Sequence, residues 1–200
     1  MDPIQKWNEK HKTKLEEKKP QEPNSLLTQL IPAVMDGTAV DLACGLGANS
    51  LHLAEKGYDV KAFDISDVAV DRVNKQAAES KLSVEAKVAD LATDDGIKLV
   101  ADTVDRIKSA EPGETSSADA VIMTYYLERK LFPFIKDLVK TEGYIFIETY
   151  VSVPGMTDKP VSEKYKLRPD ELVNEFGDWG IVYFDFNEEA GIQTIMARKK

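Results

Sequence analysis

The sequence has a single cysteine, Cys44, and only two histidines among its 200 residues. One thiol cannot build a disulfide framework or a cysteine-based metal cluster, so we expect a cytoplasmic protein without a metal site. The sequence also lacks an apolar run approaching the roughly 20 residues that span a bilayer. Its first residues, MDPIQKWNEKHKTKLEEKKP, are charged throughout and lack the apolar stretch of a signal peptide. We therefore expect no membrane partner.

Basic residues are also in deficit. The 26 lysines and arginines are outnumbered by 35 aspartates and glutamates, which gives a formal net charge of -9. Because proteins bind nucleic acids largely through basic side chains that neutralise phosphates, this balance disfavours a nucleic-acid partner. The apolar content of 42% is typical of a globular protein, and a chain of this length can bury one α/β core.

The sequence divides into an N-terminal arm, residues 1–25, and a domain, residues 26–200. The arm is rich in lysine and glutamate and closes with Pro20 and Pro23; we expect it to lie over the core as a lid. From Leu26 onward, short apolar runs alternate with helical patterns, as in a parallel sheet flanked by helices. Strands are expected at 39–43, 60–64, 83–88, 119–124, 144–149, 180–186 and 192–197. The last two should form an antiparallel pair.

Helices fit between these strands. Ser66 is a suitable N-cap for a helix that reaches about Ser80, since apolar residues recur on one face of that segment. Helices are also expected at 130–140 and 168–176. Residues 92–118 form a long polar stretch, with a possible helix at 98–108. We interpret it as a solvated insertion, with a substrate-gating segment as the alternative.

A glycine loop follows the first expected strand. Asp41 is followed by Leu-Ala-Cys and then by Gly45 and Gly47, and glycines in such a loop let the backbone approach a ligand closely. The loop departs from the NAD fingerprint, because Ser50 stands where the third glycine belongs. A carboxylate at Asp41 also favours a cation over a pyrophosphate. S-adenosylmethionine (SAM), which carries an ammonium and a sulfonium but no phosphate, fits better.

Two further carboxylates follow the next strands. Asp64 ends the second strand, where a carboxylate can accept hydrogen bonds from both ribose hydroxyls. Asp90 follows the third strand and can accept from an adenine amino group, with Ile65 and Leu91 as apolar walls for the ring. Each aspartate alone could be a cap or a turn residue. Together they follow the carboxyl ends of neighbouring strands, where open α/β sheets bind ligands, and therefore predict a cofactor site.

These segments resemble the class I SAM-dependent methyltransferases, and among them the small-molecule group that includes the tellurite- and thiopurine-resistance enzymes. The resemblance is carried by the blocks DLACGLGANSLHLAEKGYDVKAFDIS, VADL, DAVIMTYYLERKLFPFI, GYIFIETY and KLRPDEL. It implies an α/β fold with a Rossmann-like, seven-stranded, mostly parallel sheet, an antiparallel last strand and helices on both faces.

The resemblance also implies specific cofactor contacts. Asp41, Gly45 and Gly47 should line the methionine end of SAM, with Asp64 at the ribose and Asp90 with Leu91 at the adenine. Thr124, which ends the fourth strand, should face the methionine. Two positions depart from the pattern, since many relatives have glycine at Ala43 and arginine at Ala48. We expect Ala43 to be tolerated in the cofactor loop.

The acceptor side is less defined. Tyr125 and Tyr126 follow the fourth strand and alternate in facing, and we favour Tyr125 as the one that points into the site. Glu148 could orient an acceptor or act as a hydrogen-bonded cap. Arg129 could bind a substrate anion or pair with Glu128 or Asp170. Trp7 could cover the site from the arm or simply pack there.

No residue is identified as the catalytic base. His11 is a candidate, but an exposed histidine is the commoner case in so charged a stretch, and Cys44 is interpreted as structural. The sequence therefore predicts a SAM-dependent methyltransferase that acts on a small-molecule substrate as a monomer or weak dimer. An NAD(P)-dependent oxidoreductase and a non-catalytic SAM-binding module stay open as alternatives.

Overall fold

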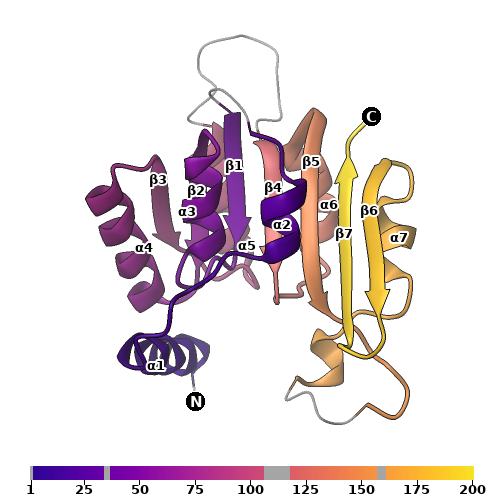
Figure 1. The fold of residues 1–200 in the computed structure, drawn as a ribbon, viewed down its shortest axis with the longest axis horizontal. Coiled ribbons are helices and arrows are strands. Elements are labelled where there is room, and N and C mark those ends of the chain that lie inside the picture. Colours follow the sequence, from indigo (N-terminus) through magenta and orange to yellow (C-terminus); the bar gives the residue numbers. More distant parts are fainter. Residues whose placement is uncertain (1, 34–36, 106–117, 157–160) are drawn as a thin grey trace.

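A computed structural model describes the chain except residues 1, 34–36, 106–117 and 157–160. Seven strands form one sheet in the order β3-β2-β1-β4-β5-β7-β6 (Figure 1). They are β1 (Gly37–Leu42), β2 (Tyr58–Asp64), β3 (Val84–Val88), β4 (Ala118–Thr124), β5 (Val139–Tyr150), β6 (Gly180–Asn187) and β7 (Ile192–Arg198). β7 runs antiparallel to both β5 and β6, whereas the other neighbouring pairs are parallel. The expected fold class is confirmed.

Helices cover both faces of the sheet. They are α1 (Pro3–Glu16), α2 (Ser25–Leu30), α3 (Ala48–Glu55), α4 (Asp67–Ser80), α5 (Asp94–Asp105), α6 (Leu131–Leu138) and α7 (Glu171–Phe176). The larger core cluster contains buried side chains of α5, α6 and α7, while two smaller clusters contain those of α2, α3 and α4. This two-sided burial explains why the central strands read as unbroken apolar runs. Among the described helices, none has the length and apolar character to cross a membrane.

The interpretation of residues 92–118 as a solvated insertion is wrong for its first part. α5 occupies residues 94–105, and its Val100 and Val104 are fully buried in the larger core. The segment reads as polar because acids such as Asp94 and Asp95 occupy the first helical turn, where the helix dipole favours negative charge. Residues 106–117 lie outside the part of the chain that the structure describes.

The parallel strands end together at the lower edge of the sheet in Figure 1, and α1 crosses below that edge beside α4. A residue at the start of α4, Ser66, holds α1 in this position. Ser66 caps α4 as expected, because its Oγ accepts a hydrogen bond from the Ala69 amide at 3.2 Å. The same hydroxyl donates to Oδ1 of Asn8 on α1 at 2.6 Å. One serine therefore joins the arm to the edge that carries the expected site.

Candidate cofactor site

The loop between β1 and α3 turns through three residues with left-handed backbones. Ala43, Gly45 and Gly47 have φ angles of 59°, 53° and 84°. Gly47 also lies against α4, since a Cβ built on it would be 2.4 Å from Cγ2 of Val73. The loop is therefore packed directly against α4, which a side chain at this glycine would prevent.

Ala43 is a side-chain-bearing residue in a conformation that suits glycine, which costs roughly 1–2 kcal/mol. We expect Ala43→Gly to raise the free energy of unfolding in urea by about 1 kcal/mol or less, because the added flexibility of the unfolded chain offsets part of the relief. Ala43→Val, which adds a β-branched side chain at the same φ, should lower it. A loss of stability in Ala43→Gly would contradict the assignment of strain to this residue.

Asp41 is the most deeply buried of the three aspartates, with 1% of its surface exposed. Its Oδ2 accepts a hydrogen bond from Oγ of Ser50 at 2.6 Å, whereas its Oδ1 is buried without a partner among the described residues. Burial raises the pKa of Asp41 to about 7, and the charge of Asp64 acts in the same direction. A buried carboxylate oxygen without a donor needs an explanation, and a bound cation would provide one.

Asp64 ends β2 with 6% of its surface exposed. Its Oδ2 accepts from the amide of Gly45 at 2.8 Å, and its Oδ1 accepts from the amide of Ser66 at 2.9 Å. The carboxylate therefore joins the glycine loop to the start of α4. A ribose at this place would share the carboxylate with two backbone amides.

Asp90 shapes the turn that follows β3. Its Oδ1 accepts from the amide of Ala92 at 2.9 Å, and α5 packs tightly behind it, since a Cβ on Gly96 would lie 2.0 Å from the Asp90 carbonyl oxygen. Sequence reasoning missed Gly96, although a glycine inside a helix is itself a signal of close packing. The two residues expected to wall the adenine differ in burial. Leu91 is buried in the larger core, whereas Ile65 is half-buried, and both stay predicted contacts.

α1 brings His11 to this edge. Its Nε2 lies 4.0 Å from Oδ1 of Asp64, and its ring is stacked on that of Trp7 at 5.7 Å. His11 is only 4% exposed, and neither ring nitrogen has a hydrogen-bond partner among the described residues. Burial lowers the pKa of His11, although the charge of Asp64 acts in the opposite direction. The expectation of an exposed histidine is wrong, because Trp7 and His11 share the helix face that covers the site.

Glu148 is the centre of a hydrogen-bonded group at the end of β5. Its Oε1 accepts from the Tyr125 hydroxyl at 2.8 Å and from Nδ2 of Asn24 at 2.6 Å, and its Oε2 accepts from Oγ1 of Thr194 at 3.0 Å. These donors come from the residue after β4, from β7 and from the turn before α2. The structure therefore favours a positioning role for Glu148 over direct contact with an acceptor.

Asn24 and Asn49 connect this group to the glycine loop. Asn49, on the first turn of α3, accepts from the Asn24 amide at 2.8 Å and donates to Oγ1 of Thr124 at 3.1 Å. Asn24 also caps α2 by accepting from two backbone amides. Thr124 is thus fixed at the end of β4 beside the cofactor loop. Sequence reasoning missed both asparagines, although the Pro-Asn-Ser turn before α2 is a recognisable cap signal.

Tyr125 has a left-handed backbone with φ of 54° and is 49% exposed. Partial burial and the hydrogen bond to Glu148 raise the pKa of its hydroxyl. Strained residues that the surrounding structure holds in place concentrate at functional sites. Tyr126 instead packs against the larger core. Of the two tyrosines, Tyr125 therefore has the more accessible ring.

Arg129 is bound within the protein, and its carboxylate partner is Glu171 and not the expected Glu128 or Asp170. Its Nε and Nη2 donate to the two carboxylate oxygens of Glu171 at 2.6 and 2.9 Å. Nη1 and Nη2 also donate to the backbone carbonyls of Lys164 and Lys166. This residue fastens the start of α7 and the segment before it to the connection between β4 and α6.

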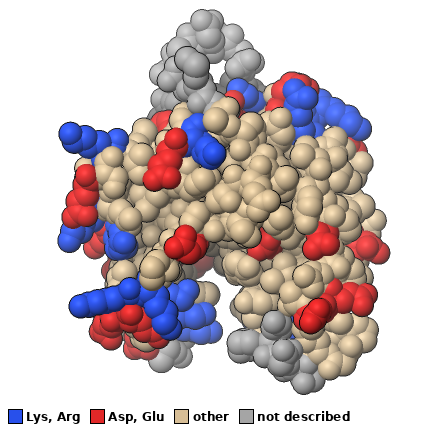
Figure 2. Space-filling model, in the orientation of Figure 1, with Lys and Arg blue, Asp and Glu red and all other residues tan. Residues whose placement is uncertain are grey.

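The protein surface is hollowed at the carboxyl edge of the central strands. Figure 2 shows this notch between α1 and the chain that follows β5. The glycine loop, the three aspartates and the Glu148 group all belong to the strand ends at this edge. The arrangement suits a ligand that lies along the ends of β3, β2, β1 and β4 with its reactive end towards β4.

Comparison with protein families gives a match over most of the chain. A family model described as "Tellurite resistance protein TehB" matches residues 17–195. Hemagglutinin 1 of Eikenella corrodens is 27% identical over 168 residues, which cover 81% of this chain and 50% of that protein. The probable S-adenosyl-L-methionine-dependent methyltransferase TehB of Haemophilus influenzae is 24% identical over 180 residues, which cover 80% of this chain and 57% of that protein. The chain thus spans about half the length of these curated relatives.

Comparison with solved structures supports the same fold. The crystal structure of TehB from Haemophilus influenzae superposes with a TM-score of 0.66 at 21% sequence identity. The superposition covers 88% of this chain and 60% of that chain. At this level of identity the likeness establishes the fold.

Proposed function

The chain belongs to the TehB family of tellurite resistance proteins, and on that premise we propose that it is a SAM-dependent methyltransferase with a small-molecule acceptor. The name of the TehB relative from Haemophilus influenzae supports the donor. The observation that carries the proposal is the buried Oδ1 of Asp41, which has no partner among the described residues and lies in the strand that leads into the glycine loop. A cationic ligand without phosphates would satisfy this oxygen.

We assign the parts of SAM to the strand ends in order. Asp41 would accept from the ammonium of the methionine end, and Thr124 borders the same end from β4. Asp64 would accept from the ribose hydroxyls. Asp90 would accept from the adenine amino group, with Ile65 and Leu91 beside the ring. The left-handed glycine loop lets the backbone approach the ligand closely.

α1 must shift for the cofactor to reach Asp64, because this carboxylate is only 6% exposed and His11 lies 4.0 Å from it. Within the described part of the chain, neither ring nitrogen of His11 has a hydrogen-bond partner, and Nε2 is the one that lies near Asp64. Polar groups of a bound ribose would give them hydrogen-bond partners. We therefore include His11 among the cofactor contacts, with Trp7 as the ring that supports it from the same helix.

When bound, SAM supplies a methyl group that is already activated by its positive sulfur. The residues of this chain would then align the acceptor and exclude water, which can supply much of the rate acceleration. Tyr125, the exposed residue at the end of β4, is the side chain that we place against the acceptor. Glu148 holds the Tyr125 hydroxyl at 2.8 Å and therefore acts as a positioning residue.

Calorimetric titration with SAM and with NAD tests the donor. We expect SAM to bind and to release a proton, because the Asp41 carboxyl has a pKa of about 7 and is mostly protonated at pH 6. A bound cation favours the charged form, so SAM affinity should rise as pH increases from about 5.5 to 7 and level off above. Titrations at pH 6 in two buffers of different ionisation enthalpy measure the released proton.

Asp41→Asn is the control for this titration. Its side chain cannot ionise, so we expect the proton release to disappear and SAM to bind more weakly at pH 7.5. Binding of NAD without binding of SAM would contradict the proposed donor and favour an oxidoreductase. An unchanged proton release in Asp41→Asn would assign the released proton to another group.

A transfer assay with SAM labelled in its methyl group tests the acceptor. We expect label in small molecules from a fractionated extract and none in protein fractions. Label in protein would contradict the small-molecule acceptor. Tight SAM binding without transfer to any fraction would favour a non-catalytic SAM-binding module.

A further inference from the structure

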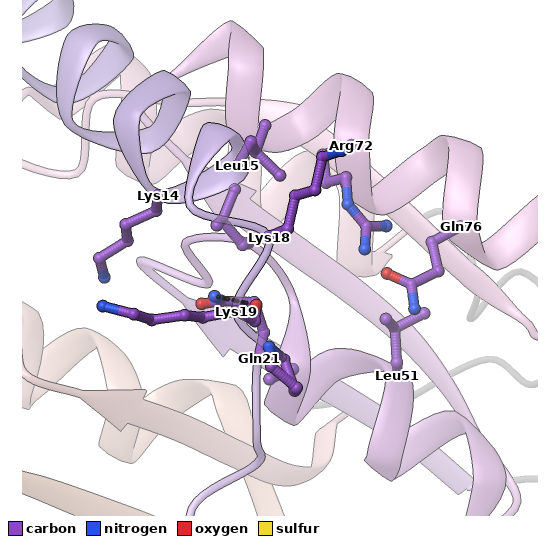
Figure 3. A pocket seen from close by; sticks show the side chains of 11 residues that line it. Lys14, Leu15, Lys18, Lys19, Gln21, Leu51, Arg72 and Gln76 are labelled. Atoms are coloured by element: carbon purple, nitrogen blue, oxygen red, sulfur yellow. Dashed lines mark hydrogen bonds between the residues drawn. The ribbon is translucent and has the colours of Figure 1, made fainter.

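A second cavity lies where the end of α1 and the chain that follows it meet α3 and α4 (Figure 3). Its volume is about 510 Å³. The polar side chains in its lining are four cations and two amides: Lys14, Lys18, Lys19, Arg72, Gln21 and Gln76. Among the described residues, no acid lines this cavity, although acids outnumber bases in the chain. This concentration of positive charge runs against the composition of the protein.

This cavity is separate from the proposed cofactor site, because none of the three aspartates lines it. It is nevertheless a neighbour of that site. Leu46 of the glycine loop and Ala48 of the first turn of α3 form part of its wall. Leu15 and Leu51 add apolar surface. The cavity therefore has a charged side and an apolar side.

The cations of this cavity come from both sides of the contact between α1 and α4. Lys14 belongs to α1 and Arg72 to α4, while Lys18 and Lys19 follow α1. Within the described residues, Lys19 forms an ion pair with Glu17 at 3.0 Å, and both side chains are largely exposed. Like charges that line one cavity repel, and an anion bound among them would remove this repulsion.

The positive charge of Lys14 affects two nearby residues of α1, Lys10 and His11. Burial and then the charges of Lys14 and Lys6 lower the pKa of Lys10. The charges of Lys14 and Lys10 also act to lower the pKa of His11, in addition to its burial. The positive field at the end of α1 therefore extends to the residue that lies over Asp64.

We propose that this cavity is a binding site for a small oxyanion of the phosphate class, bridging the lysines at the end of α1 to Arg72 on α4. A guanidinium presents paired donors that match two oxygens of such an anion, and ammonium groups add point charges. Gln21 and Gln76 offer amide donors, and the N-terminus of α3 favours negative charge. Leu15 and Leu51 would contact the organic part of a phosphate ester.

Binding at this place would hold α1 against α4. The same helix carries His11, so the anion would favour the observed position of α1, with His11 over Asp64. This consequence depends on the proposed cofactor site, whereas the anion site itself does not. If the protein binds the anion but does not bind SAM, the anion site is supported and only the proposed function is overturned.

Thermal unfolding and calorimetry of the full chain test the site, with inorganic phosphate, pyrophosphate and uridine 5′-monophosphate as probes. The measurements are made at low ionic strength, where screening is weak. We expect at least one probe, at about ten times its dissociation constant, to raise the melting temperature by roughly 3 °C more than sodium chloride of equal ionic strength. Stronger binding of the nucleotide than of the inorganic anions would identify a phosphate ester as the ligand.

The variant Lys14→Gln/Lys18→Gln/Arg72→Gln should bind the probe at least tenfold more weakly. Its control, Lys12→Gln/Lys75→Gln/Lys200→Gln, changes the net charge equally at exposed residues outside the cavity and should bind as the unmodified protein does. Stabilisation no greater than that given by sodium chloride would overturn the proposal. Equal loss of affinity in the two triple variants would also overturn it, since the effect would then come from overall charge.

Discussion

Asp64→Ala is expected to weaken SAM binding at least tenfold and to destabilise the fold. The ribose would lose hydrogen bonds to a charged group, each worth about 1.5–3 kcal/mol, and each 1.4 kcal/mol is tenfold in affinity. The same carboxylate accepts from the part-buried amide of Gly45 and from the buried amide of Ser66. Both amides would lose their partner, so the free energy of unfolding should fall by about 2–4 kcal/mol. Calorimetry with SAM and urea unfolding measure the two effects.

Two control variants separate binding from stability. Asp64→Asn keeps one carbonyl oxygen as an acceptor, so it should destabilise less than Asp64→Ala while still weakening SAM binding. Ser66→Ala removes the cap of α4 and the contact with Asn8 but keeps the carboxylate. It should therefore lower stability with a smaller effect on affinity. Unchanged SAM affinity in folded Asp64→Ala would remove the ribose assignment.

Gly47→Ala should be among the most destabilising single-methyl additions in this protein. The new Cβ would lie 2.4 Å from Cγ2 of Val73, and the backbone would carry a side chain at φ of 84°. Overpacking costs about 1–3 kcal/mol, and a left-handed backbone adds roughly 1–2 kcal/mol. We therefore expect the free energy of unfolding to fall by about 2–5 kcal/mol in a urea titration. SAM affinity should fall as well, because relief of the contact moves the glycine loop.

The double variant Gly47→Ala/Val73→Ala separates the contact from the backbone strain. Val73→Ala alone should lower stability, because it would leave a small cavity in the core cluster to which Val73 of α4 belongs. The double variant lacks the two Val73 methyl groups. Its free energy of unfolding should therefore fall by less than the sum of the two single decreases, by about 1 kcal/mol or more. If the two decreases add strictly, the clash with Val73 is not the cause of the destabilisation in Gly47→Ala.

Local sequence determined most of the architecture. Each expected strand overlaps one of the seven observed strands, and the helix from Asp67 to Ser80 begins after the expected cap. Such features depend on neighbours in the chain: apolar periodicity, a capping serine, and glycines where the backbone turns. The three aspartates at the sheet edge follow from the same logic, because parallel strands bring their carboxyl ends together. Family membership agrees with the motif that begins at Asp41.

Contacts between distant segments could not be read from the chain. The expected helix at 98–108 overlaps α5, but the polar composition of the segment did not predict that Val100 and Val104 fill the core once the helix lies on the sheet. Arg129 had several possible partners, and only the fold brings Glu171 within 2.6 Å of it.

His11 is an example at the site itself. Its neighbours in the sequence are charged, and they do not reveal that the fold buries its ring beside Trp7 and Asp64. Hydrophobic pattern and turn chemistry act over a few residues and leave a signal in the sequence. The partner of a buried charge depends on which elements pack together, and only the tertiary structure decides that.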